Sequence, residues 1–192
     1  MRKRILPWLL CALTLCQAAA AAAPAAPLER LMALLAQRKH GEVTFVERDH
    51  LSILTRPLES SGVLLYEAPD HLEKRTLKPH RITLVFDHGA LTATRGARTY
   101  HIDLSAHREI APYIDAVIDT LSGNRAGLER LFKVSLQGGL DRWTLTLRPR
   151  DTHSSHIRLI RIEGARADIR SVDIFKANGD HSQMTLGPAP PR

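Results

Sequence analysis

The stretch Gly62–Pro79, GVLLYEAPDHLEKRTLKP, decides the fold, because it contains two short strands separated by a turn. Side chains along a strand alternate between its two faces. In the first strand Leu64 and Tyr66 therefore point to one face, and Val63 and Leu65 point to the other. A sheet that is apolar on both sides needs cover on both, so the question is which parts of the chain supply it.

The same period of two continues along most of the chain, in short runs that end at turn residues. Seven runs occupy residues 42–48, 50–57, 62–68, 71–78, 81–87, 90–95 and 98–104. Five more occupy residues 133–138, 142–149, 156–164, 168–177 and 181–187. The connections within the first group are too short for the crossover that parallel strands require, so the runs predict an antiparallel meander of about eleven or twelve strands.

Three segments have helical spacing instead. Amphipathic helices are expected at residues 28–39 and 108–123. The apolar face of the second helix consists of Ile110, Ile114, Val117, Ile118 and Leu121. A third helix, at residues 124–132, begins at Asn124, a residue type that caps helix N-termini well.

These elements predict an α+β fold: an incomplete antiparallel β-barrel with helices covering its concave face. A sheet of about eleven strands twists and curls, which gives it a concave side. The apolar faces of the helices can cover that side in part and leave a hydrophobic groove, or they can seal it into a dry core. The sequence pattern leaves both arrangements open.

The chain begins with the layout of a cleavable signal peptide at residues 1–23, followed by a domain at residues 24–187 and a Pro-rich tail at residues 188–192. Three basic residues precede an apolar run, and alanines offer small-residue cleavage sites. The run contains Pro7 and is short against the roughly 20 residues of a spanning helix, which disfavours an uncleaved anchor. We therefore expect export into the periplasm of a Gram-negative bacterium.

Composition narrows the function classes. Both cysteines, Cys11 and Cys16, lie in the predicted signal peptide, so the mature chain has no thiol for a disulfide or for catalysis. The residue before Cys16 is Leu15, which is too large for lipoprotein processing. Loss of three basic residues with the signal peptide lowers Lys+Arg from 27 to 24 against 20 acidic residues, a net charge of +4. The basic residues are scattered, so nucleic-acid binding is not expected.

No catalytic or metal-binding pattern stands out in the sequence. Most of the 10 histidines fall at predicted turns or strand ends, where solvated polar residues are ordinary. His153 and His156 could ligate a metal on a helical turn, but no third ligand lies near them in the sequence. Asp115 and Asp119 oppose the apolar face of their helix and are expected in solvent. The sequence predicts a non-enzymatic, monomeric protein without cofactor or metal.

Several segments, in their order and spacing, resemble the LolA-type periplasmic carriers of outer-membrane lipoproteins. They are the first amphipathic helix, Phe45-Val46-Glu47, GVLLYEAPDHLEK at 62–74, KPHRITLVFDHG at 78–89, the two later helices, WTLTLRP at 143–149 and NGDHSQMTL at 178–186. The resemblance covers nearly the whole mature chain. It implies an incomplete barrel with a helical lid, whose cavity accepts acyl chains from an inner-membrane transporter and delivers them to an outer-membrane acceptor.

Residues at alternating strand positions are expected to line this concavity, namely Phe45, Leu64, Tyr66, Leu72, Trp143, Leu145 and Leu147. The apolar face of the second helix is expected to form a lid that moves aside for cargo. In the carriers, the resemblance implies, an arginine before a proline latches the lid, and this position is Ala68 here. Arg75 or Arg81 could compensate, or both could be solvated charges at strand edges.

The sequence therefore favours a periplasmic carrier that transfers the acyl chains of a lipoprotein, or another lipid, from the inner to the outer membrane. The alternative is a lipid-sensing or regulatory module of the cell envelope, similar to the stress-sensor domains that share this fold. An enzyme on the same fold is the third option. The hydrocarbon of lipoproteins, phospholipids, glycolipids and polyene-like pigments is similar, so the sequence does not name the cargo.

Overall fold

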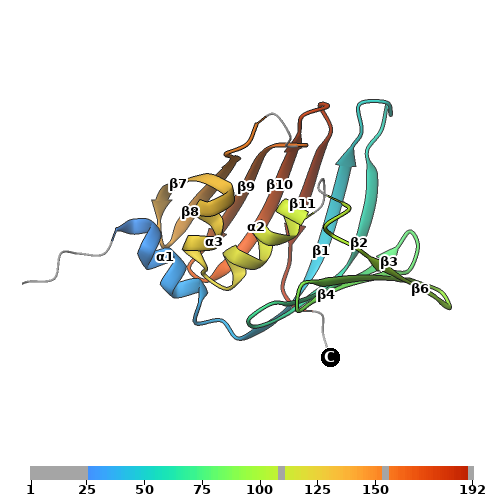
Figure 1. Ribbon diagram of the computed structural model, residues 1–192, viewed down its shortest axis with the longest axis horizontal. Helices are drawn as coiled ribbons and strands as arrows, with labels where there is room; N and C mark the ends of the chain where they lie inside the picture. Colours follow the sequence, from blue (N-terminus) through green and yellow to red (C-terminus); the bar gives the residue numbers. More distant parts are fainter. Residues whose placement is uncertain (1–25, 108–110, 153–155, 190–192) are drawn as a thin grey trace, which may run out of the picture.

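The computed structural model describes residues 26–107, 111–152 and 156–189, and it contains one large antiparallel sheet with three helices. Figure 1 shows the helices together on one face of the curved sheet. The sheet has eleven strands, and its two edge strands do not pair with each other in the described part of the chain. The predicted α+β fold, an incomplete antiparallel barrel with helices on its concave side, is confirmed.

The helices are α1 (Pro27–Leu35), α2 (Ala111–Leu121) and α3 (Arg125–Leu131). The strands before α2 are β1 (His40–His50), β2 (Leu58–Glu67), β3 (His71–Lys78), β4 (Ile82–Asp87), β5 (Ala90–Arg95) and β6 (Arg98–Ile102). The strands after α3 are β7 (Phe132–Gly139), β8 (Arg142–Pro149), β9 (Ile157–Ala165), β10 (Asp168–Lys176) and β11 (His181–Leu186).

The strand order is β6-β5-β4-β3-β2-β1-β11-β10-β9-β8-β7, so the sheet consists of two meanders rather than the single one expected. The first and last strands join them, with Phe45 of β1 opposite Leu186 of β11. β6 and β7 lie at the two edges of the sheet, although β7 is the next strand after β6 along the chain. They can be far apart because the connection between them contains α2 and α3 and is long enough to cross the concave face.

One predicted strand, at residues 50–57, is wrong. β1 continues through the expected break at Arg48-Asp49 as far as His50, and residues 51–57 form the connection to β2. The charged residues near the end of β1 do not form a turn, because one of them pairs with a residue of the neighbouring strand. Arg48 Nε lies 2.8 Å from Glu59 Oε1 on β2.

The helices follow their predicted positions with shifted ends. α1 has Pro27 in its first turn and ends at Leu35, four residues before the expected end. The side chain of Asn124 caps α3 as expected, because its Oδ1 accepts a 3.1 Å hydrogen bond from the Gly127 N–H. The start of the second predicted helix, including Ile110, lies outside the described residues.

The larger hydrophobic core lies between the three helices and the strands β7–β11 with β1, and α2 contributes Ala116 to it. Leu31 of α1, Leu128 of α3 and Leu145 of β8 have no exposed surface. Each such side chain contributes about 1.5–3 kcal/mol when it is removed from water. A smaller cluster joins Ile114 and Ile118 of α2 to the strands β4 and β5.

The predicted signal peptide, residues 1–23, lies outside the described residues. At the other end, the Pro188 carbonyl accepts hydrogen bonds from the Thr44 N–H at 3.2 Å and from Thr44 Oγ1 at 3.1 Å. The start of the Pro-rich tail is therefore held against β1. None of the helices in the described ranges is long and apolar enough to cross a membrane.

Candidate functional site

A cavity of about 310 Å³ lies between α2 and the concave face of the sheet. This volume is at the lower end of the roughly 300–1,000 Å³ usual for ligand sites. Almost all of the lining side chains are aliphatic or aromatic, and the charged ones are Arg38 and Lys74. The lining therefore favours hydrocarbon over polar ligands.

Two rows of side chains that cross the first meander form the sheet side of the cavity. The first row consists of Tyr66, Leu72, Phe86, Leu91 and Ile102, each opposite the next in the strand register. The second row consists of Val43, Leu64, Lys74 and Leu84. Antiparallel pairing places opposite residues on the same face, so the alternation seen in the sequence becomes a wall that is apolar except at Lys74.

The helix α2 forms the opposite side of the cavity. Tyr113, Ile114, Val117 and Leu121 line it, at the spacing of one helical face. Ile118 is buried beside them in the smaller cluster with Phe86 and Leu91. Of the five residues expected in the lid, Ile114, Val117 and Leu121 line the cavity, and Ile110 lies outside the described residues.

Three of the seven residues expected in the cavity wall, Leu64, Tyr66 and Leu72, line it. The other four lie in the larger core, each at most 1 % exposed: Phe45, Trp143, Leu145 and Leu147. All seven share the concave side of the sheet. Strand periodicity predicts this side, but it does not predict which part of it α1 and α3 cover.

The second meander supplies lining residues that the sequence analysis missed, namely Ala167, Ile169, Val172, Met184 and Leu186. They belong to β10, β11 and the turn before β10. Met184 and Leu186 alternate along β11 in the sequence, whereas an irregularity between Ile169 and Ser171 interrupts the alternation in β10. What was missing is the pairing of β11 with β1, which brings these side chains beside Val43 and Leu64.

A buried polar cluster bounds the cavity on its sheet side. Glu47 is 8 % exposed, and the Lys74 ammonium forms an ion pair with its Oε2 atom. Ser60 Oγ donates to Oε2 at 3.2 Å, and Ser182 Oγ donates to Oε1 at 3.3 Å. The Lys74 ammonium also lies 5.0 Å from the centroid of the Phe45 ring. Hydrogen bonds thus compensate the buried carboxylate, as a buried charge requires.

Tyr113 lies on α2 above this cluster. Burial raises the pKa of its hydroxyl, and the negative charges of Glu47 and Asp49 raise it further. Both effects disfavour the phenolate. The Tyr113 hydroxyl therefore stays protonated at physiological pH and places a neutral polar group in the cavity wall.

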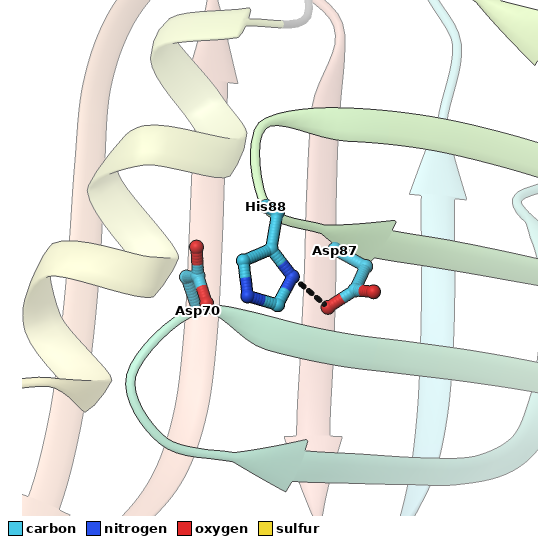
Figure 2. Close-up of side chains that lie close together, drawn as sticks. All are labelled: Asp70, Asp87 and His88. Carbon is cyan, nitrogen blue, oxygen red and sulfur yellow. Dashed lines mark hydrogen bonds and ion pairs between the residues drawn. The ribbon is translucent and has the colours of Figure 1, made fainter.

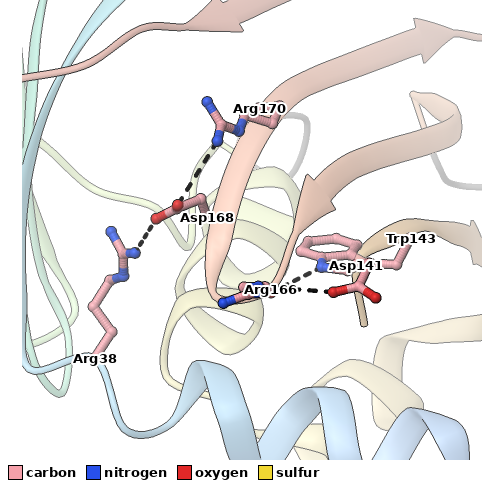
Figure 3. A network of polar contacts seen from close by, with 6 residues as sticks. All are labelled: Arg38, Asp141, Trp143, Arg166, Asp168 and Arg170. Carbon is pink, nitrogen blue, oxygen red and sulfur yellow. Dashed lines mark hydrogen bonds and ion pairs between the residues drawn. The ribbon is translucent and has the colours of Figure 1, made fainter. Parts of the chain in front are cut away.

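Ion pairs at Asp168 join the connection after α1 to the start of β10, as Figure 3 shows. Arg38 Nη2 pairs with Asp168 Oδ1, and Arg170 Nη2 lies 3.8 Å from Asp168 Oδ2. The Arg38 side chain is 29 % exposed and also lines the cavity. Next to this group, Trp143 Nε1 donates a 2.9 Å hydrogen bond to the Arg166 carbonyl. Arg38 thus stands between the apolar cavity and solvent.

Ala68, the expected latch position, is partly buried, and its N–H donates a 2.8 Å hydrogen bond to the Lys39 carbonyl. Arg75, one of the two residues considered as a replacement, pairs with both carboxylate oxygens of Glu73, at 2.7 and 2.8 Å. Arg81, the other, is exposed. The only arginine among the described residues that lines the cavity is Arg38.

A group of atoms that could ligate a metal ion lies at two hairpin turns (Figure 2). Asp70, Asp87 and His88 each offer one such atom, all within 4.8 Å of one another. His88 Nδ1 lies 2.9 Å from Asp87 Oδ1, and His71 Nδ1 lies 3.2 Å from the same oxygen. The hydrogen bond from His71 lowers the pKa of Asp87, and His88 lowers it further. The two histidines already provide polar partners for the Asp87 carboxylate, and His88 is exposed.

Asp115 and Asp119 on α2, expected in solvent, are partly buried. Burial raises the pKa of both carboxyl groups. Asn124 Nδ2 donates a 2.7 Å hydrogen bond to Asp119 Oδ1, which ties the end of α2 to the cap of α3. The Asp119 contact is therefore structural. Of the histidine pair considered for metal binding, His156 is exposed and His153 lies outside the described residues.

The family described as "Outer membrane lipoprotein carrier protein LolA-like" matches residues 19–190. The match includes every described helix and strand. No curated protein sequence is significantly similar to the chain.

Solved structures with a similar fold share little sequence with the chain. A LolA superfamily protein from Nitrosomonas europaea is 8% identical, with a TM-score of 0.45, over 88% of this chain and 96% of that one. LprF from Mycobacterium bovis is 13% identical, with a TM-score of 0.40, over 86% and 94%. A putative outer membrane lipoprotein-sorting protein domain from Vibrio parahaemolyticus is 10% identical, with a TM-score of 0.43, over 83% and 88%. Likenesses this distant carry no argument about function.

Proposed function

Because the chain belongs to the LolA-like family of outer membrane lipoprotein carrier proteins, we propose that it carries an acylated lipoprotein or another lipid across the periplasm. The hydrocarbon of the cargo occupies the cavity between α2 and the sheet. The observation that carries the proposal is the apolar lining of this cavity. The chain receives its cargo at the inner membrane and delivers it at the outer membrane, without catalysis or a cofactor.

The size of the hydrophobic effect supports an acyl ligand. Each methylene group moved from water into an apolar site contributes about 0.8 kcal/mol. Ten buried methylenes give roughly 8 kcal/mol, from which the cost of ordering the chain and the protein is subtracted. The result corresponds to reversible binding, which a carrier needs because it must also release its cargo.

The helix α2 serves as the lid in this proposal. Its cavity-facing side chains, with Ile118 and the predicted Ile110, separate from the sheet when cargo enters. Exposure of this face costs about 25 cal/mol for each Å² of apolar surface. Incoming hydrocarbon covers the same surface and offsets that cost, so the lid opens readily only when cargo is present.

Ala68 bears on the release of cargo. An alanine provides no charge-assisted hydrogen bond to the lid, a contact worth about 1.5–3 kcal/mol where it is made. We expect the substitution Ala68→Arg to speed cargo transfer to acceptor vesicles, because the missing latch shifts the balance toward retention. Equal transfer and lid-opening rates for Ala68→Arg and the unmodified protein would exclude a shared latch mechanism.

The proposal is tested by native mass spectrometry of protein isolated gently from the periplasm, followed by binding of a fluorescent acyl probe. The substitution Leu64→Asp places a charge in the cavity wall and should abolish probe binding. Leu65→Asp is the matched control, because Leu65 is the next residue on β2, is also partly buried, and points to the other face. Probe binding should survive in Leu65→Asp.

Three results would contradict the proposal in different ways. Wild-type affinity in a folded Leu64→Asp protein would mean that the cavity does not hold the probe. Absence of any acyl ligand or probe binding would remove the carrier function itself. A protein that binds lipid but never transfers it to acceptor vesicles would support the sensing module instead.

A further inference from the structure

We propose that the cargo carries an acidic group, a carboxylate or a phosphate, and that Arg38 binds this group at the cavity mouth while hydrocarbon fills the cavity. The inference rests on the proposed carrier function and names the chemical class of its ligand. It starts from the two charged side chains in an otherwise apolar lining, Arg38 and Lys74. Their surroundings differ, and the difference decides which one can accept an anion.

Lys74 is already neutralised inside the wall. Its ammonium pairs with Glu47, a carboxylate that is 8 % exposed and is held by two serine hydroxyl groups. An acidic group brought to Lys74 would meet the Glu47 carboxylate at close range in a poorly solvated site. Like charges in such a site repel strongly. The Glu47–Lys74 pair therefore limits the cavity to uncharged parts of the ligand.

Arg38 has the opposite setting. It shares Asp168 with Arg170, so two guanidinium groups stand at one carboxylate and the group of three has a net charge of +1. Asp168 is 53 % exposed and Arg38 is 29 % exposed, which places the excess positive charge at the border with solvent (Figure 3). An acidic group can reach this position from water while its hydrocarbon enters the cavity.

The chemistry of arginine suits this task. A guanidinium has five N–H donors in a planar fork that matches the oxygens of a carboxylate or phosphate. The Arg38 side chain forms its ion pair with Asp168 through Nη2, which leaves further donors for a ligand. When Arg38 turns to the acidic group, Arg170 remains beside Asp168. The exchange therefore leaves no carboxylate without a cation.

The experiment compares three single-chain probes with the same hexadecanoyl chain, each below its micelle concentration. Hexadecanoate has a carboxylate, hexadecanoyl-lysophosphatidylglycerol has a phosphate, and monohexadecanoylglycerol is neutral. Both acidic probes should bind at least about tenfold more tightly than the neutral one, as one charge-assisted contact predicts. Inorganic phosphate at millimolar concentration should displace none of them, since it lacks hydrocarbon.

Two substitutions should move this preference in opposite directions. Arg38→Gln should remove the preference for acidic probes and leave the affinity for the neutral probe unchanged. Asp168→Asn removes the competing carboxylate and should raise the affinity for both acidic probes. Arg95→Gln, at an exposed arginine of the β5–β6 hairpin, is the matched control and should bind all three probes as the unmodified protein does.

Other outcomes would overturn the inference. They also distinguish its failure from a failure of the proposed carrier function. Equal affinity of the unmodified protein for all three probes would remove the acidic-group site while the carrier function stands. A preference that survives Arg38→Gln and disappears in Lys74→Met would mean that Lys74 in the cavity wall, and not Arg38, binds the acidic group. Displacement by inorganic phosphate alone would indicate an anion site that is independent of hydrocarbon. Absence of binding by any probe would refute the carrier function as well.

Discussion

The two meanders of the sheet have the same alternation of side chains and different contents on their concave side. Under α1 and α3, the strands β7–β9 of the second meander are sealed, and Trp143, Leu145 and Leu147 are at most 1 % exposed. Under α2, the first meander borders the cavity, and its wall residues Leu64 and Leu72 remain partly exposed. The difference indicates that helix cover, and not strand composition, separates a dry core from an open cavity.

The arrangement of the helices explains this contrast. α1 and α3 lie against β7, and each also contacts α2. α2 extends to the far strands of the first meander, where Ile114 and Ile118 pack with Phe86 and Leu91 of β4 and β5. One helix cannot fill the concave side of a curved sheet, so space remains between them. Apolar side chains on both meanders border that space.

The largest test of the comparison applies the same substitution to both meanders. Leu145→Ala should lower the free energy of unfolding by about 2–5 kcal/mol, because it leaves a new void in a packed core. Leu64→Ala should cost clearly less, because it only enlarges an existing cavity. Urea denaturation of both variants checks this. Equal losses would mean that the two meanders are packed alike.

A glycine of β9, in the sealed part of the sheet, gives the second test. A Cβ atom on Gly164 would lie 2.2 Å from Trp143 Cζ2 and 2.5 Å from the Asp168 carbonyl oxygen. Gly164→Ala should therefore destabilise the protein by about 1–3 kcal/mol, as overpacking does. Gly139→Ala is the control, since a Cβ atom there has no neighbour within 4 Å. Thermal unfolding of the two variants should differ, and a neutral Gly164→Ala would show a loosely packed core.

The mobility of the open side can be tested by a cross-link. Cysteines introduced at Ile114 and Leu91, which belong to the same small cluster, would tie α2 to β5. Oxidation should slow loading of an acyl probe by at least about tenfold, roughly 1.4 kcal/mol in the barrier. Reduction should restore the rate in the same sample. An unchanged rate in fully cross-linked protein, verified by mass spectrometry, would exclude a moving lid.

The smallest expected effect concerns pH and the outer side of α2. Burial raises the pKa of Asp115, so the folded state holds this proton more tightly than the unfolded state does. The resulting stability is complete at acid pH and is lost as pH rises from about 4 through the raised pKa. Asp115→Asn removes this loss and should stabilise the protein at pH 7 by less than about 1 kcal/mol, because solvent screens a partly exposed group.

The gain from Asp115→Asn should vanish near pH 3, where the carboxyl group is protonated in both states. Stability curves of the two proteins across this pH range check the sign. Destabilisation at pH 7 would mean that the attraction between Asp115 and Arg130, which opposes the shift, outweighs burial.

Sequence reasoning succeeded where the signal is local. The period of two fixed almost every strand, and the capping side chain of Asn124 marked the start of α3 correctly. It failed at residues 50–57, where the pattern predicts a strand and the chain instead ends β1 at His50 and forms the connection to β2. Charged residues in a strand can pair with the neighbouring strand, as Arg48 does with Glu59, and periodicity alone does not distinguish such pairing from a turn.

The sequence by itself determined which side of each strand is apolar and which helix faces oppose it, because both follow from backbone geometry over a few residues. Only the tertiary structure decided that β11 pairs with β1, that α1 and α3 seal the strands β7–β9, and that the cavity remains beside α2. It also brought Arg38 to Asp168, 130 residues away in sequence. Such contacts depend on long-range strand pairing, which no local pattern contains.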